Sequence, residues 1–207
     1  MRRVLIATSN PGKLRDFAGA AAVHGIEVQG VPGFASLPQV REDGATFEAN
    51  ARKKAEHYSR LVPGEIVLAD DSGLEVEALD GAPGVHSARY AATAPLGNSD
   101  DAANNARLLR ELGAASEQRR RARFVCVIAA ARDGRTLGTF RGAAEGRILP
   151  APRGFRGFGY DPLFFFPPLA RTFGELTAEE KARVSHRGEA FRKFLGWFER
   201  DPSLHSE

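Results

Sequence analysis

The first twenty-five residues constrain the fold most, because they place a buried strand directly before a loop and a helix. Val4-Leu5-Ile6-Ala7 is a continuous apolar run, the pattern of a strand that is covered on both faces. The following segment, KLRDFAGAAAVHG, is rich in alanine and has a helical pattern that ends at Gly25. A buried strand that leads into a helix is the repeating unit of α/β folds, so we expect that class.

Apolar patterns farther along the chain extend this arrangement. Thr46 has the side chain of a helix N-cap, and Asp133-Gly134 supplies the positive φ that a tight hairpin turn needs. Between the second strand and the Thr46 cap, 32–45 is expected to be a long loop. The predicted elements are strands at 26–31 and 65–69, helices at 46–59 and 99–112, and a hairpin at 122–140.

The C-terminal third predicts two more strands and two helices. A strand is expected to reach Leu149, and Phe164-Phe165-Phe166 is expected to be a core strand. Thr177 and Glu180 have the spacing of a capping box. A last helix presents Phe191, Phe194, Leu195 and Phe198 at the spacing of core packing. Together these elements predict an α/β fold around a mixed sheet, in a single domain spanning 1–207.

Composition limits the class of protein. The chain has 207 residues, 43% of them hydrophobic, and no apolar run approaches the roughly 20 residues that cross a bilayer. We find no secretory signal and expect a cytoplasmic protein without a membrane partner. Cys126 is the single cysteine and predicts a buried thiol. The net charge of +3 is modest. The basic run 119–123 is interpreted as a solvated loop, with a nucleic-acid patch as the alternative.

The loop after the first strand has the composition of an anion site. Unpaired N–H groups at a helix start and the helix dipole both favour negative charge. The loop adds side-chain donors, a glycine that permits close approach and a lysine charge; its residues are Thr8, Ser9, Asn10, Pro11, Gly12 and Lys13. Ala7 and Leu14 stand where the Walker pattern has glycine and a hydroxyl, so a metal would need carboxylates from elsewhere. An ordinary capped helix start is the alternative.

The segment ADDSGL supplies such carboxylates. Asp70 and Asp71 lie where a buried strand is expected to end, the edge at which open α/β sheets bind ligands. Neighbouring strand residues face opposite sides, so the two would share one role only if a turn begins between them, which Ser72 and Gly73 predict. Mg²⁺ carried in with phosphates needs only one or two carboxylates. Glu42 is a weaker second candidate, and a turn that merely ends the strand is the alternative.

An aromatic loop and a cluster of cations follow near the C-terminus. Phe158, Gly159, Tyr160 and Asp161 combine aromatic rings with exposed backbone, a surface on which a nucleobase would stack. Aromatic packing within the loop is the alternative. Lys181, His186 and Arg187 are expected near the start of the last helix, where Ser185 is the cap, and an ordinary basic surface is their alternative. Phosphate donors, a metal site and a base platform are what a nucleoside triphosphate requires.

These residues resemble a known family, the non-canonical purine nucleoside triphosphate pyrophosphatases, also called inosine triphosphate pyrophosphatases. The likeness covers nearly the whole chain through six ordered motifs, ATSNPGK, EDGATFEANARKKA, ADDSGLEV, GAPGVHSARY, GFGYDPLFF and ELTAEEKARVSHRG. It implies hydrolysis of inosine, deoxyinosine and xanthosine triphosphates to the monophosphate and pyrophosphate, with Mg²⁺ as cofactor. It further implies an elongated mixed sheet flanked by helices, a nucleotide cleft between two lobes, and a homodimer.

The resemblance also implies roles for individual residues. Asp71 matches the family's metal ligand and general base, and Ser72 matches a substrate contact. Glu42 and Asp70 match acidic positions associated with the metal. The phosphate-binding and base-binding segments of the family correspond to Thr8–Lys13, Phe158–Asp161, Lys181, His186 and Arg187. One departure is Ala49, which stands where many members have a glutamate, and we expect it to affect metal affinity.

The expected mechanism follows from these roles. Mg²⁺ neutralises phosphate charge, and water, oriented or deprotonated by Asp71, attacks the α-phosphorus. Lys13 and, more weakly, Lys54 hold the triphosphate. Arg187 or a backbone N–H in 158–161 would recognise the 6-carbonyl and leave adenine unpaired. The rivals are a nucleotide sensor without catalysis and a nucleic-acid-binding module, although we expect no nucleic-acid partner.

Overall fold

The protein is described by a computed structural model in which residues 2–21, 26–92, 99–201 and 204 are placed. None of the described helices is long and apolar enough to span a bilayer. The strands are β1 (Arg2–Ile6), β2 (Ile26–Gly30), β3 (Val67–Val76), β4 (Arg121–Arg132), β5 (Arg135–Ile148), β6 (Phe164–Phe166) and β7 (Arg171–Thr172). The helices are α1 (Pro11–Ala21), α2 (Phe47–Ser59), α3 (Asp101–Leu112), α4 (Ala178–Val184) and α5 (His186–Arg200).

The first strand directs the start of the fold, as its sequence predicts. β1 is buried from Val4 to Ile6, so it lies inside the sheet rather than at an edge. It pairs in parallel with β2 on one side and β3 on the other, with Leu5 opposite Gln29 and Val67. Parallel neighbours need crossover connections, and α1 and α2 lie in those connections. The predicted helix end at Gly25 lies outside the described residues.

The sheet is mixed, which confirms the predicted fold class. Its strand order is β2-β1-β3-β4-β5-β6-β7, with parallel pairs around β1 and antiparallel pairs around β6. β4 and β5 are joined at Asp133 (φ 51°) and Gly134 (φ 79°), the two positive φ angles of the predicted hairpin turn. β5 continues to Ile148, so the strand expected to reach Leu149 is the second half of the hairpin.

Backbone contacts divide the chain into two compact units. Unit 1 consists of Met1–Asp71, Cys126–Gly142 and Ala182–Glu207, and unit 2 of Ser72–Val125 and Ala143–Lys181. Neither unit is a continuous piece of sequence, because β3, β4 and β5 each supply residues to both. The single domain and the cleft between two lobes stay predictions.

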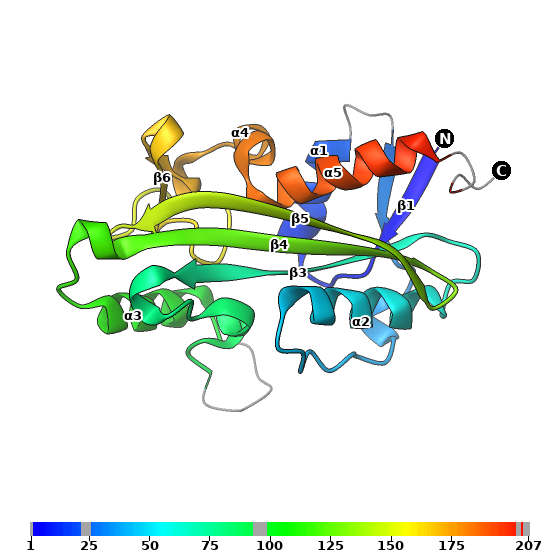
Figure 1. The fold of residues 1–207 in the computed structure, drawn as a ribbon, viewed down its shortest axis with the longest axis horizontal. Helices are drawn as coiled ribbons and strands as arrows, with labels where there is room; N and C mark the ends of the chain where they lie inside the picture. Colours follow the sequence, from blue (N-terminus) through cyan, green and yellow to red (C-terminus); the bar gives the residue numbers. More distant parts are fainter. Residues whose placement is uncertain (1, 22–25, 93–98, 202–203, 205–207) are drawn as a thin grey trace. The chain divides into compact units, whose positions relative to one another are not determined.

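Unit 1 has helices on both faces of its strands. α1 and α5 lie on one side of the strands and α2 lies on the other (Figure 1). The predicted stripe of α5 is core packing: Phe191 and Phe194 are fully buried, and Phe191 meets Phe17 of α1 edge to face at 5.2 Å between centroids. On the other side of the strands, the apolar face of α2 is buried and includes Phe47 and Tyr58.

Unit 2 has its own aromatic core. Phe124 of β4 packs against Phe164 of β6 and against Phe173, with ring centroids 4.6 and 5.8 Å apart. The predicted core strand at 164–166 is therefore confirmed as β6. α3 begins at Asp101 rather than near Ser99, because the side chain of Asp100 caps it. The basic run is only partly a solvated loop, since Arg120 is buried and donates to backbone carbonyls and Arg121 begins β4.

The structure of β3 differs from the sequence prediction at the acidic residues on which the site depends. The predicted turn at Asp71-Ser72-Gly73 does not form, and the strand runs unbroken from Val67 to Val76. Leu74 and Val76 are fully buried, so the apolar core after the acidic pair keeps the chain extended despite its turn-forming residues. Asp70 and Asp71 therefore lie within a strand and not at its end.

Candidate functional site

The loop before α1 caps that helix, and the phosphate-binding role predicted for the loop stays a prediction. The side chain of Asn10 accepts the N–H groups of Gly12 at 2.8 Å and Lys13 at 3.2 Å, and Thr8 accepts the N–H of Asn10 at 3.1 Å. These backbone donors are therefore engaged within the loop. Ser9 and Pro11 are exposed, and Gly12 is buried. The positive charge of the loop comes from the ammonium of Lys13.

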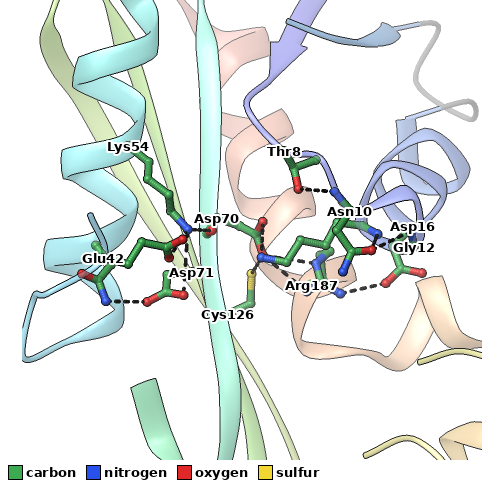
Figure 2. A network of polar contacts seen from close by, with 12 residues as sticks. Thr8, Asn10, Gly12, Asp16, Glu42, Lys54, Asp70, Asp71, Cys126 and Arg187 are labelled. Carbon is green, nitrogen blue, oxygen red and sulfur yellow. Dashed lines mark hydrogen bonds and ion pairs between the residues drawn. The ribbon is translucent and has the colours of Figure 1, made fainter. Parts of the chain in front are cut away.

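Asp70 occupies the centre of a buried cluster of charges (Figure 2). One carboxylate oxygen lies 2.9 Å from the Lys13 ammonium, and the other accepts from the guanidinium of Arg187 at 3.3 and 3.4 Å. Arg187 also donates to Asp16 at 2.8 Å. Its guanidinium is thus held in the protein interior by two carboxylates. The role predicted for Arg187 in recognising the base stays a prediction.

Asp71 lies in a different cluster, against α2. Asn50 donates to its Oδ2 at 2.9 Å, and the Lys54 ammonium lies 4.0 Å from its Oδ1. The same ammonium donates to Glu42 at 2.6 Å and to the backbone carbonyl of Asp70 at 2.8 Å. Two carboxylates therefore gather about one positive charge. Oxygen ligands converging on a cation are what Mg²⁺ would also require, so Glu42 and Asp71 fit a metal ligand pair.

The pleat of β3 separates the two aspartates. Figure 2 shows their carboxylates leaving the strand on opposite sides, as successive residues of a continuous strand must. Asp70 shares its side with Leu68, which packs in the core beneath α1 and α5. Its carboxylate is paired with two cations there, and the metal-ligand role predicted for Asp70 stays a prediction. Among the described residues, no three His, Cys, Asp or Glu side chains gather as a metal site.

Burial and charge act differently on the two carboxyls. Burial raises the pKa of Asp71, and the nearby Lys54 and Lys13 only partly oppose it. Burial also acts to raise the pKa of Asp70, but Lys13 and Arg187 outweigh it and hold that pKa well below its usual range. Burial lowers and the carboxylates raise the pKa of Lys54, which ends above its ordinary value. Asp70 is therefore a fixed anion, whereas Asp71 is the carboxyl nearer to accepting a proton.

In unit 2 the aromatic loop is held by a buried ion pair. Asp161 accepts the N–H of Phe158 at 2.9 Å and pairs with the Lys181 ammonium at 2.5 Å. That ammonium lies 4.7 Å from the centre of the Phe158 ring. The hydroxyl of Tyr160 donates to the carbonyl of Ser87 at 2.9 Å. Three predicted base-binding residues, Phe158, Asp161 and Lys181, therefore lie together.

The other predicted residues are placed as follows. Ser72 is a partly buried residue of β3, and His186 is buried at the start of α5, where Ser185 is the predicted cap. Ala49 is exposed, and its N–H is the one that the Thr46 cap accepts. Position 49 therefore contributes no carboxylate to the cluster around Lys54.

Comparison with known proteins now decides the family. The model of the Ham1 family matches residues 4–197. The chain belongs to the Ham1 family. A dITP/XTP pyrophosphatase of Geobacillus kaustophilus is 47% identical over 193 residues, covering 93% of this chain and 92% of the relative. One of Exiguobacterium sp. is 50% identical, covering 92% and 94%. The structure of the Staphylococcus aureus Ham1 protein matches with a TM-score of 0.80 and 40% identity, covering 96% and 99%.

Sequence reasoning missed three polar residues of this Ham1-family chain. Asn50 orients Asp71, and Asp101 and Asn105 of α3 bond the backbone of the aromatic loop. A signal existed for Asn50: together with Lys54 it interrupts the apolar face of α2 with polar side chains, which is unusual unless they meet a buried partner. Asp101 and Asn105 gave no comparable signal, because polar residues in the first turns of a helix are common.

Proposed function

We propose that this protein hydrolyses the triphosphates of inosine, deoxyinosine and xanthosine to the monophosphate and pyrophosphate. The supporting observation is the cluster around Asp71 in a chain that is 47% identical to a dITP/XTP pyrophosphatase over 93% of its length. A buried carboxylate, oriented by Asn50 and neighboured by Glu42 and Lys54, has the groups that phosphoryl transfer to water requires. Such an activity would remove deaminated purine nucleotides from the cellular pool of nucleotide precursors.

The residues of unit 1 would act on the phosphate end. Asp71 and Glu42 would hold Mg²⁺, with substrate oxygens and water completing its shell. When bound, the ion supplies positive charge against the phosphate oxygens. The Lys54 ammonium would donate hydrogen bonds to the same phosphate oxygens after its hydrogen bond to Glu42 breaks. Lys13 would do so from the α1 side, where Asp70 holds its ammonium in place.

Asp71 would also act on the attacking water. Its carboxylate would take the proton as the water oxygen bonds to the α-phosphorus. The bond between that phosphorus and the bridging oxygen then breaks, and its electrons leave with pyrophosphate. Asn50 would keep the carboxylate in a fixed direction through its hydrogen bond to Oδ2. The chain thereby provides a base whose orientation is set before substrate binds.

The aromatic loop of unit 2 would bind the base. The Phe158 ring offers a stacking face, and Lys181 beside it offers a donor for the 6-carbonyl of hypoxanthine or xanthine. Adenine presents an amino group at that position, so a fixed donor would meet another donor and lose its hydrogen bond. Roles for Ser72, Tyr160 and His186 in substrate binding stay predictions, as do the homodimer and the cytoplasmic location.

The test is pyrophosphate release from inosine, xanthosine, guanosine and adenosine triphosphates, with and without Mg²⁺. We expect activity on the first two that requires the metal. Asp71→Asn should lower kcat about a hundredfold to ten-thousandfold, the range that a positioned general base contributes. Asp43→Asn is the matched control, because Asp43 is an exposed aspartate that pairs with Lys53 and lies next to Glu42 in sequence.

Other outcomes would contradict this function in distinct ways. Equal rates on adenosine triphosphate would remove the base selectivity. Release of single phosphates would make the protein a phosphatase. Tight binding of inosine triphosphate without any product would make it a nucleotide sensor, and salt-dependent binding of single strands without hydrolysis would make it a nucleic-acid-binding protein.

A further inference from the structure

Gly159 lies at the centre of the proposed base-binding loop and is bonded on both sides by one helix. Its N–H donates to Oδ2 of Asp101 at 2.6 Å, and its carbonyl accepts from Nδ2 of Asn105 at 3.0 Å. Asp101 and Asn105 are four residues apart in α3, the spacing that places two side chains on the same helix face. The helix therefore grips a single residue of the loop at two points.

α3 is itself firmly placed in unit 2. Leu108 and Leu112 bury its apolar side, and Asn104 accepts the N–H of Ala91 at 2.8 Å. The Asp100 side chain caps its first turn by accepting the N–H of Ala103 at 2.6 Å. A helix fixed in this way can hold the loop because its own position does not depend on the loop.

The loop needs these two hydrogen bonds because the residue that they hold, Gly159, is a glycine. Gly159 has φ +61°, in the left-handed region that favours glycine, and it has no side chain that could anchor it by packing. An unrestrained glycine has more backbone freedom than any other residue. Phe158 precedes it, and Tyr160, anchored through its hydroxyl to Ser87, follows it. Asp161 holds Phe158 by accepting its N–H at 2.9 Å, so the two bonds from α3 to Gly159 complete the restraint of the backbone between Phe158 and Tyr160.

We propose that Asp101 and Asn105 are positioning residues for the nucleobase, which fix Gly159 so that Phe158 presents its ring in one orientation before substrate binds. This rests on the proposed function of the loop. Neither side chain touches the base; each acts through the backbone of Gly159. Ordering the loop in advance removes an entropy cost that binding would otherwise bear.

The test compares four variants of the full chain with the wild type. Asp101→Ala and Asn105→Ala each remove one bond to Gly159. Asp101→Asn keeps an oxygen that can accept the same N–H, and serves as the conservative rescue. Asp100→Ala is the matched control, since it removes the cap of the same helix without touching the loop.

Inorganic tripolyphosphate has no base, so comparing it with inosine triphosphate separates a loss of base positioning from a general loss of folding. We expect Asp101→Ala to raise KM for inosine triphosphate roughly tenfold, about the effect of losing one hydrogen bond to a charged group, and Asn105→Ala to raise it by less, because its bond joins two neutral groups. Inhibition by inorganic tripolyphosphate should stay unchanged in both. Asp101→Asn should resemble the wild type, and Asp100→Ala should lower the melting temperature but leave KM unchanged.

Amide hydrogen exchange over residues 155–163 measures directly how strongly α3 restrains the loop backbone, and it does not depend on catalysis. Exchange should be faster in Asp101→Ala and Asn105→Ala than in the wild type and Asp101→Asn. Unchanged exchange and unchanged KM in the alanine variants would overturn the proposal, as would an equal rise of KM in Asp100→Ala. A wild type that releases no pyrophosphate would overturn the proposed function, even if exchange shows that the grip exists.

Discussion

At the scale of single residues, the pleat of β3 assigns two neighbouring aspartates to different tasks. Asp70 is 2% exposed and neutralises Lys13 and Arg187 on one side of the strand. Asp71 meets Asn50 and Lys54 on the other side. A buried carboxylate between two cations cannot be removed without leaving those cations uncompensated in the interior. Asp70 therefore supports the site through stability and through the position of Lys13.

Asp70→Asn is expected to reduce the free energy of unfolding by about 3–5 kcal/mol, the cost of breaking a buried ion pair from one side. Urea denaturation of the wild type and the variant measures this difference. The exposed pair of Asp43 with Lys53 is the control, and Asp43→Asn should change the same quantity by less than about 1 kcal/mol.

Adding Arg187→Met to Asp70→Asn sharpens this prediction. Once the carboxylate is gone, replacing the guanidinium should cost less than it does in the wild type, because the two residues are coupled. Equal effects of Arg187→Met in both backgrounds would mean that the pair contributes nothing, and the role given to Asp70 would be wrong.

At the scale of the elements, helix starts are defined by side chains that accept backbone N–H groups. Thr46, Asp100 and Ser185 cap α2, α3 and α5 in this way. α4 begins with the predicted capping box: Thr177 accepts the N–H of Glu180 at 3.2 Å, and Glu180 accepts that of Thr177 at 2.8 Å. These contacts fix where a helix starts, and thereby where the residues after the cap are placed.

The capping box of α4 should make stability depend on pH. Hydrogen bonds from Arg171 and from the Thr177 backbone lower the pKa of Glu180 to about 2. A lowered pKa means that the ionised form is favoured by folding, so its contribution is present above the unfolded value of about 4.3 and is lost as pH falls toward 2. The melting temperatures of wild type and Glu180→Gln should differ above that value and converge below it.

The exposed Glu77 provides the control for this titration. Glu77→Gln removes an exposed carboxylate that is not part of the capping box, and its melting temperature is measured at the same pH values for comparison. A difference between wild type and Glu180→Gln that is the same at every pH would show that the carboxylate charge is not what stabilises the start of α4.

At the scale of the whole molecule, two aromatic cores hold the elements that carry the site. In unit 1, Phe194 packs against Phe191 and Phe198 beneath the strands that hold Asp70 and Asp71. In unit 2, the cluster of Phe124, Phe164 and Phe173 supports the strand beside the aromatic loop. The site residues come from distant parts of the sequence, so their geometry depends on these cores.

Phe194→Ala should therefore lower the free energy of unfolding by about 3–5 kcal/mol, because it opens a cavity in a fully packed interior. Phe155→Ala is the same substitution at a residue that is 89% exposed, and it should have little effect. Chemical denaturation monitored by circular dichroism compares the two. Similar losses in both variants would show that the aromatic stripe of α5 is not the core of unit 1.

Much of the secondary structure could be predicted because its causes are local. Apolar runs, the Thr46 cap, the Asp133-Gly134 turn and the stripe of α5 all act within a few residues, and each was confirmed. The turn after Asp71 was wrong for a tertiary reason. Ser72 and Gly73 favour a turn, yet the buried residues that follow keep β3 extended.

For the site, the sequence by itself determined the family, the loop before α1 and the acidic pair of β3, because these are residue types in a fixed order. Only the tertiary structure decided which partners they meet: Asp70 with Arg187, Asp71 with Asn50, and Gly159 with α3. These partners are separated by 117, 21 and 58 positions. Contacts over such separations depend on how the sheet brings helices together, and local propensity does not contain that information.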